Sequence, residues 1–155
     1  MKGSAVTERL LRLTAFVSAA AFLLSATLHV ASLWGHIVDS FPVVAALYYG
    51  MLPIAVPSVW ANHRLVRGYR KNEYRRAILR GCPGWMKKLV YLLGIYTIVG
   101  FFLFSLLHLF GSHSRGVDPA DVWSMRLASL LWMIFYATAG AVLYSGAKVY
   151  GSDNE

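Results

Sequence analysis

Four stretches of the 155-residue chain contain no Asp, Glu, Lys or Arg, and each is between 21 and 26 residues long. They cover residues 13–38, 40–63, 89–114 and 127–147. A helix of about 20 apolar residues crosses the hydrocarbon core of a bilayer, which is about 30 Å thick. The sequence therefore predicts an all-α, polytopic membrane protein, and it excludes a soluble globule, a coiled coil and a disordered tail.

The spacing of these stretches predicts a single domain, residues 1–155, built as an up-and-down bundle of four transmembrane helices. We expect the spans at about residues 12–35, 41–63, 87–111 and 123–147. An alternative interpretation takes the first stretch as a cleaved signal peptide, because Lys2, Arg9 and Arg12 precede it. The stretch is longer than the about 7–15 residues of a signal's apolar region, which favours a retained span.

Positive charge is concentrated in one segment. Nine of the fifteen Lys and Arg residues lie between Arg64 and Lys88, in the segment that joins the second and third spans. The loops expected on the other side of the membrane hold only Arg115 and Arg126. Because cytoplasmic loops carry an excess of Lys and Arg, we expect segment 64–88 and both termini in the cytoplasm.

Six side chains of segment 64–88 are the expected contacts with anionic lipid headgroups or an acidic partner: Arg64, Arg67, Lys71, Arg75, Lys87 and Lys88. The first four recur at steps of three and four residues, which predicts that the second span continues into the cytoplasm as a helix with one basic face. Each basic residue beside an anionic leaflet gains about 1 kcal/mol, so lipid alone accounts for these charges. Nucleic acid is not an expected partner.

Two histidines are expected at similar depth near the outer face, because the first and third spans both run outward. They are His29 and His108. Paired imidazoles at one depth are typical axial ligands of a b-type haem, so a b-type haem is a candidate cofactor. The candidate ligands of a metal ion at the same face are His36 and His113, together with Asp39, Asp118 and Asp121. A histidine near a helix end also hydrogen-bonds carbonyl groups or contacts headgroups, and this simpler interpretation stays open.

Signs of catalysis are absent from the sequence. The uncharged stretches contain no membrane-buried carboxylate of the kind found in proton and ion pathways, and no nucleophile-elbow, zinc-protease or Walker motif occurs. Cys82 is the only cysteine, which excludes an intramolecular disulfide and a C-x-x-C site. Ala137, Ala141 and Ser145 recur at four-residue steps, and we expect this small-residue face to pack against another part of the same chain.

Aromatic and turn residues recur in the second half of the chain. The first group is Cys82-Pro83-x-Trp85, followed by Tyr91, Tyr96 and Phe102-x-Phe104. The second is Trp132-x-x-Phe135-Tyr136 with Leu143-Tyr144-Ser145. Together they resemble a family of small uncharacterised bacterial membrane proteins with four helices. The resemblance implies a setting in the bacterial inner (plasma) membrane, and it implies no activity, cofactor or binding residue.

The favoured hypothesis is a non-catalytic accessory or interaction protein that contacts other membrane subunits or a second copy of itself. The first alternative is a redox protein that holds a b-type haem or a metal ion through the outer histidines. The second is an oligomeric small-molecule carrier that uses the kinks expected at Pro53 and Pro57 in the second span.

Overall fold

The computed structural model describes residues 3–36, 41–110 and 119–152, which form helices joined by turns. The helices are α1 (Gly3–Leu33), α2 (Phe41–Val66), the 3-10 helix η1 (Lys71–Glu73), α3 (Tyr74–Ile78), α4 (Gly84–Phe110) and α5 (Pro119–Ser152). Stretches long and apolar enough to cross a membrane lie in α1, α2, α4 and α5. The predicted all-α class with four spans is confirmed.

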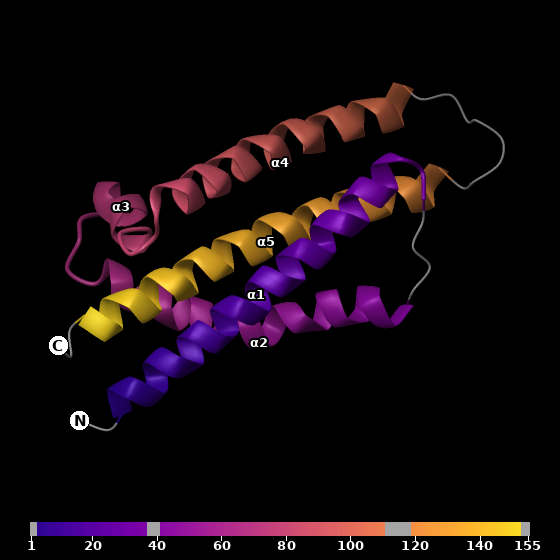
Figure 1. Ribbon diagram of the computed structural model, residues 1–155. Coiled ribbons are helices and arrows are strands. Elements are labelled where there is room, and N and C mark those ends of the chain that lie inside the picture. The colour runs from indigo at the N-terminus through magenta and orange to yellow at the C-terminus, as the bar shows by residue number, and fades with distance from the viewer. Residues whose placement is uncertain (1–2, 37–40, 111–118, 153–155) are drawn as a thin grey trace.

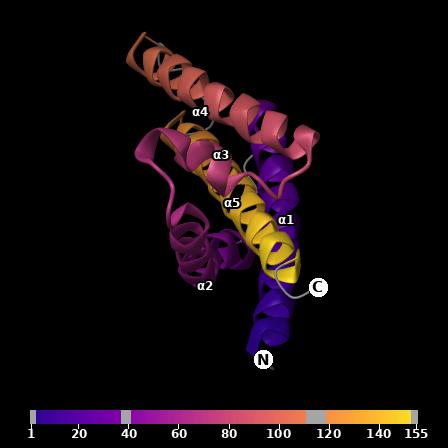
Figure 2. The same ribbon diagram turned by 90° about the vertical axis from the view of Figure 1, so that its left-hand side faces the viewer.

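The helix α5 is central to the bundle. It contacts α1, α2, α3 and α4, and α1 also contacts α2. The views in Figures 1 and 2 show α2 and α4 on different sides of α5, with α1 lying along it. Both chain ends and α3 lie at the same end of the bundle (Figure 1), as an up-and-down order of four long helices requires.

Large apolar side chains cover the outer faces of the long helices. Examples are Phe16 on α1 (74% exposed), Val56 on α2 (73%), Leu92 on α4 (66%) and Phe102 on α4 (63%). In water, an apolar surface of this extent would drive association. In a bilayer the same side chains face lipid tails, so the surface matches the membrane setting that the span lengths indicate.

The helices α1 and α5 pack through residues that repeat every seven positions. The repeat is Leu11, Ser18, Ser25 and Ser32 on α1 and Ser129, Tyr136 and Leu143 on α5. Each of these seven residues is at most 1% exposed. Small side chains let two helix backbones approach closely, and such van der Waals packing drives helix association in membranes. The hydroxyl of Ser18 also donates to the carbonyl oxygen of Tyr136 at 2.8 Å.

Tyr136 fixes α2 to α5 as well. Its hydroxyl donates to the carbonyl oxygen of Leu47. Gly50 leaves the space for that hydroxyl, since a Cβ at position 50 would lie 3.1 Å from the hydroxyl oxygen. The helix α2 continues through Pro53 and Pro57 as one element.

We expect Tyr136→Phe to lower the free energy of unfolding by about 1 kcal/mol, because hydrogen bonds between membrane helices contribute roughly 0.6–1.7 kcal/mol each. Reversible unfolding in mixed detergent micelles measures the change. Tyr144→Phe is the matched control on α5, since Tyr144 is 38% exposed. Equal losses in the two variants would contradict the assignment of this hydrogen bond.

The predicted cytoplasmic continuation of α2 is wrong. The helix ends at Val66, and Gly68 has a φ of +89°, a left-handed conformation that glycine adopts without strain. The chain then forms η1 and α3, and the backbone N–H of Arg70 donates to the Glu73 carboxylate at 3.3 Å. The basic residues before and after Gly68 therefore do not share one helical face.

The first and last helices also extend past the predicted spans. The helix α1 begins at Gly3, and α5 runs on to Ser152. A helix satisfies its own backbone groups, so it can continue beyond the bilayer into water. Glu8 and Arg12 form an ion pair in the extension of α1.

The turn before α4 packs directly on α5. The backbone N–H of Gly81 donates to Ser145 Oγ at 3.1 Å, and Cys82 Sγ donates to the carbonyl oxygen of Ala141 at 3.2 Å. A Cβ on Gly81 would lie 2.9 Å from the carbonyl oxygen of Ser145. The small residues Ala141 and Ser145 thus contact another part of the same chain, as predicted.

Candidate functional site

A polar cluster inside the bundle surrounds His29, which is 2% exposed. Its Nδ1 lies 2.9 Å from Ser129 Oγ on α5, and its Nε2 lies 2.7 Å from the Tyr96 hydroxyl on α4. The His29 and Tyr96 rings meet edge to face with their centroids 5.7 Å apart. One side chain of α1 therefore joins α1, α4 and α5.

The partners of His29 assign its tautomer. Ser129 Oγ lies 2.7 Å from the carbonyl oxygen of Met125 and 3.1 Å from that of Arg126, so its single proton is directed at the α5 backbone. Nδ1 of His29 must then carry a proton and donate it to Ser129, which leaves Nε2 to accept from Tyr96. The chain of donors runs from Tyr96 through His29 to Ser129 and ends on a backbone carbonyl.

Arg126 lies at the C-terminal end of α1, a few residues beyond His29. Its Nε donates to the carbonyl oxygen of Ser32 at 3.0 Å, and its Nη2 donates to that of Leu33 at 3.4 Å. The last carbonyl groups of a helix have no partner within the helix, and a cation beside them is favoured by the helix dipole. Arg126 therefore serves as a cap of α1 from α5.

The residues predicted for haem or metal binding are only partly described. His108 lies in α4 and Asp121 in α5, but both side chains are outside the described residues, as are His113, Asp39 and Asp118. His36 follows the end of α1 and is exposed. Among the described residues no group of three potential ligands converges on a metal site. An iron ligand at His29 would have to replace Tyr96 or Ser129, and the haem hypothesis stays a prediction that a Soret band of the purified protein would support.

The predicted lipid or partner contacts gather at the end of the bundle that carries α3. Arg64, Arg67, Lys71, Arg75 and Lys88 are exposed, and Lys87 is half-buried. Glu73 is the only acidic residue from Arg64 to Lys88. Arg80 donates to the Tyr69 hydroxyl at 2.9 Å, which ties the two ends of segment 69–80 together. The segment therefore forms a compact cap with a cationic surface.

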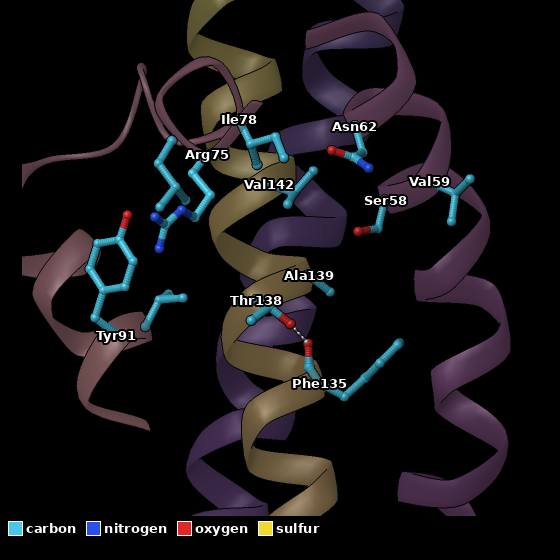
Figure 3. Close-up of a pocket in the computed structure, with 12 residues that line it drawn as sticks. Ser58, Val59, Asn62, Arg75, Ile78, Tyr91, Phe135, Thr138, Ala139 and Val142 are labelled. Carbon is cyan, nitrogen blue, oxygen red and sulfur yellow. Dashed lines mark hydrogen bonds between the residues drawn. The ribbon is translucent and has the colours of Figure 1, made fainter. Parts of the chain in front are cut away.

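A cavity of about 350 Å³ lies beneath this cap, between α2 and α4. The residues that line it come from four helices and the turn after α3: Ser58, Val59 and Asn62 of α2, Arg75 and Ile78 of α3, Leu79 of the turn, Val90 and Tyr91 of α4, and Phe135, Thr138, Ala139 and Val142 of α5. In Figure 3, Arg75 and Tyr91 lie on the α4 side of the cavity, and Ser58 and Asn62 lie on the α2 side. Among the described residues, Asn62 Oδ1 is buried and has no hydrogen-bond partner.

The cavity and the His29 cluster were not predicted from the sequence. Ser129 and Tyr96 are ordinary residues of membrane helices until their partners are known. The sequence indicated only that a polar side chain inside a span generally requires a hydrogen-bond partner on another helix. Spacing along the chain does not show which helix supplies that partner.

Cys82 lies just before α4 and is 5% exposed. Burial raises the pKa of its thiol, so a smaller fraction is the reactive thiolate at neutral pH. We expect maleimide at pH 7 to label Cys82 much more slowly than a Lys71→Cys thiol in a Cys82→Ala background, with the difference narrowing as the pH rises. Equal labelling rates in the folded proteins would contradict this arrangement, and labelling after unfolding provides the control.

No family model matches the chain, and neither a curated protein nor a solved structure matches it. The molecule that the structure defines is a multi-pass membrane protein of four long helices, with a polar cluster around His29 and a cavity under a cationic cap. The resemblance to small bacterial membrane proteins stays a prediction.

Proposed function

We propose that this protein is a non-catalytic accessory or interaction protein of the bacterial inner membrane, with both termini and segment 64–88 in the cytoplasm. The observation that carries the proposal is a stripe on the central helix that is exposed at Leu131 and half-buried at its other residues. Leu131, Phe135, Thr138 and Val142 form one stripe of α5, since they are separated by four, three and four residues. Among the described residues, α2 and α4 do not contact each other across this stripe.

The stripe is suited to a further membrane component. Leu131 lies on the central helix and is nevertheless 55% exposed. Helices associate in membranes by close packing, and an apolar stripe between two flanking helices offers more contact area than a single convex helix. A partner helix, or a second copy of this chain, would pack at Leu131.

The orientation rests on charge. Both chain ends and α3 lie at one end of the bundle, and segment 64–88 carries nine of the fifteen basic residues. The positive-inside rule favours this end for the cytoplasm, where the exposed basic side chains meet anionic headgroups.

The direction of the hydrogen bonds around His29 favours a structural role over catalysis. A serine nucleophile needs a histidine that accepts its proton. Here the Ser129 proton is directed at backbone carbonyl oxygens, and Nδ1 of His29 is the donor. The pair is therefore suited to joining helices.

Site-specific photo-crosslinking in native membranes tests the proposal. We expect a benzophenone side chain at Leu131 to form one discrete adduct, which mass spectrometry identifies as a membrane protein or a second copy of this chain. The same group at Phe16, on the outer face of α1, is the control and should give no discrete adduct. Lipid-sized adducts alone at both positions would contradict an accessory role.

A further inference from the structure

We propose that the cavity between α2 and α4 binds one anionic phospholipid from the surrounding leaflet, with the lipid phosphate at Arg75 and part of an acyl chain against α5. The inference concerns this cavity only. Phe135, Thr138 and Val142 belong both to the cavity and to the α5 stripe described above, so the partner is expected to pack at Leu131, which lies outside the residues that line the cavity.

The floor of the cavity suits an acyl chain. Its volume of about 350 Å³ falls within the range of about 300–1,000 Å³ that is typical of small-molecule sites. Phe135 and Val142 of α5 are seven residue steps apart, about 10 Å along the helix. Thr138 is the polar residue among the α5 residues that line the cavity, and its hydroxyl already donates to the carbonyl oxygen of Ile134 at 2.7 Å. The floor therefore presents apolar surface to an occupant.

The entrance of the cavity suits a phosphate. Arg75 lines the cavity and is exposed, and no carboxylate among the described residues forms an ion pair with it. The nearby Glu73 carboxylate instead accepts from the backbone N–H of Arg70. A guanidinium binds phosphate oxygens through two parallel hydrogen bonds, and basic pockets between membrane helices on the cytoplasmic side are known lipid-headgroup sites.

Asn62 supplies a second polar contact. Its buried Oδ1 has no partner among the described residues, and Figure 3 shows that oxygen turned toward α5. A buried acceptor without a donor is unfavourable, so a hydroxyl group at this position would be stabilised. A phosphate and a hydroxyl on one amphiphile are the chemistry of a phosphatidylglycerol headgroup.

A lipid bound in the cavity can be distinguished from lipids that are attracted to the cationic cap without a defined site. Arg76 is adjacent to Arg75 on α3 and is also exposed, but it does not line the cavity. Removing the charge of Arg75 or that of Arg76 weakens the unspecific attraction of anionic lipids to the cap by the same amount. Only removal of Arg75 affects a site inside the cavity.

Native mass spectrometry of the full chain tests the proposal. The protein is released from micelles that contain phosphatidylglycerol or the zwitterionic phosphatidylcholine. We expect one phosphatidylglycerol per chain and no stable phosphatidylcholine complex, and excess inorganic phosphate should not displace the lipid. Arg75→Gln should weaken retention about tenfold, because it removes charge-assisted hydrogen bonds, whereas Arg76→Gln should change it little.

A second pair of variants tests the cavity itself without a change of charge. Ser58→Phe places a ring in the cavity and should abolish retention, whereas Val56→Phe on the outer face of α2 should preserve it. Circular dichroism and gel filtration check that each variant is folded. If Ser58→Phe does not fold, the comparison of Arg75→Gln with Arg76→Gln, both at exposed positions, tests lipid binding in the cavity. Equal losses for Arg75→Gln and Arg76→Gln, equal binding of the two lipids, or full retention in folded Ser58→Phe would each overturn the proposal.

Discussion

Gly81→Ala is expected to destabilise the protein by about 1–3 kcal/mol, the usual cost of adding a methyl group to a closely packed contact. A Cβ at this position would lie 2.9 Å from the carbonyl oxygen and 3.0 Å from Cα of Ser145. Both atoms belong to the backbone of the central helix, so the turn has to move. That movement also removes the hydrogen bond from Gly81 to Ser145 Oγ.

Two measurements check this result. Reversible unfolding in mixed micelles gives the free energy, and maleimide labelling of Cys82 reports whether the turn has separated from α5. Gly84→Ala is the control, since a Cβ there meets no atom within 4 Å, and we expect a change within about 0.5 kcal/mol. A Gly81→Ala protein as stable as the control, with Cys82 still protected, would show that this close approach is not present.

His29→Ala is the second change with a large expected effect, a loss of about 1–3 kcal/mol. It removes two hydrogen bonds between helices, each contributing roughly 0.6–1.7 kcal/mol in a membrane. Among the described residues, the hydrogen bond between His29 and Tyr96 joins α4 to α1. We therefore expect the α4 backbone near Tyr96 to show faster hydrogen exchange in this variant.

A double-mutant cycle separates the contribution of the hydrogen bond between His29 and Tyr96 from that of the other contacts of His29. Tyr96→Phe removes one of the two hydrogen bonds and should cost less than His29→Ala, and the double variant should cost less than the sum because the two residues share that bond. His63→Ala is the control at an exposed histidine and should be nearly neutral. Additive losses in the cycle would contradict the contact between His29 and Tyr96.

The four spans could be predicted because the bilayer imposes a length on any uncharged helix. The packing of the Ala141 and Ser145 face within the chain followed from residue size. The break after Val66 was missed because the basic residues keep a helical spacing through Gly68, and the left-handed conformation of that glycine is decided by the fold. The seven-residue repeat of Ser18, Ser25 and Ser32 is visible in the sequence, but only the structure shows that this face packs against α5.

The candidate sites were less predictable. His29 was identified as unusual, but its partners come from two other helices, and tertiary packing alone brings Tyr96 and Ser129 to it. The cavity combines residues from α2, the cap and α5 that are far apart in the chain. From the sequence, Arg126 was counted only as a charge on the outer side, whereas in the structure it caps the end of α1.

In the proposed topology the chain crosses the membrane four times, with its cationic cap and both termini on the cytoplasmic side. Single cysteines at His36 and Lys71, in a Cys82→Ala background, test this topology most directly, because both positions are exposed and lie on opposite sides of the predicted membrane. A membrane-impermeant maleimide applied to intact cells should label His36→Cys at once, and Lys71→Cys only after the membrane is opened. Labelling of Lys71→Cys in intact cells, with His36→Cys protected, would contradict this topology.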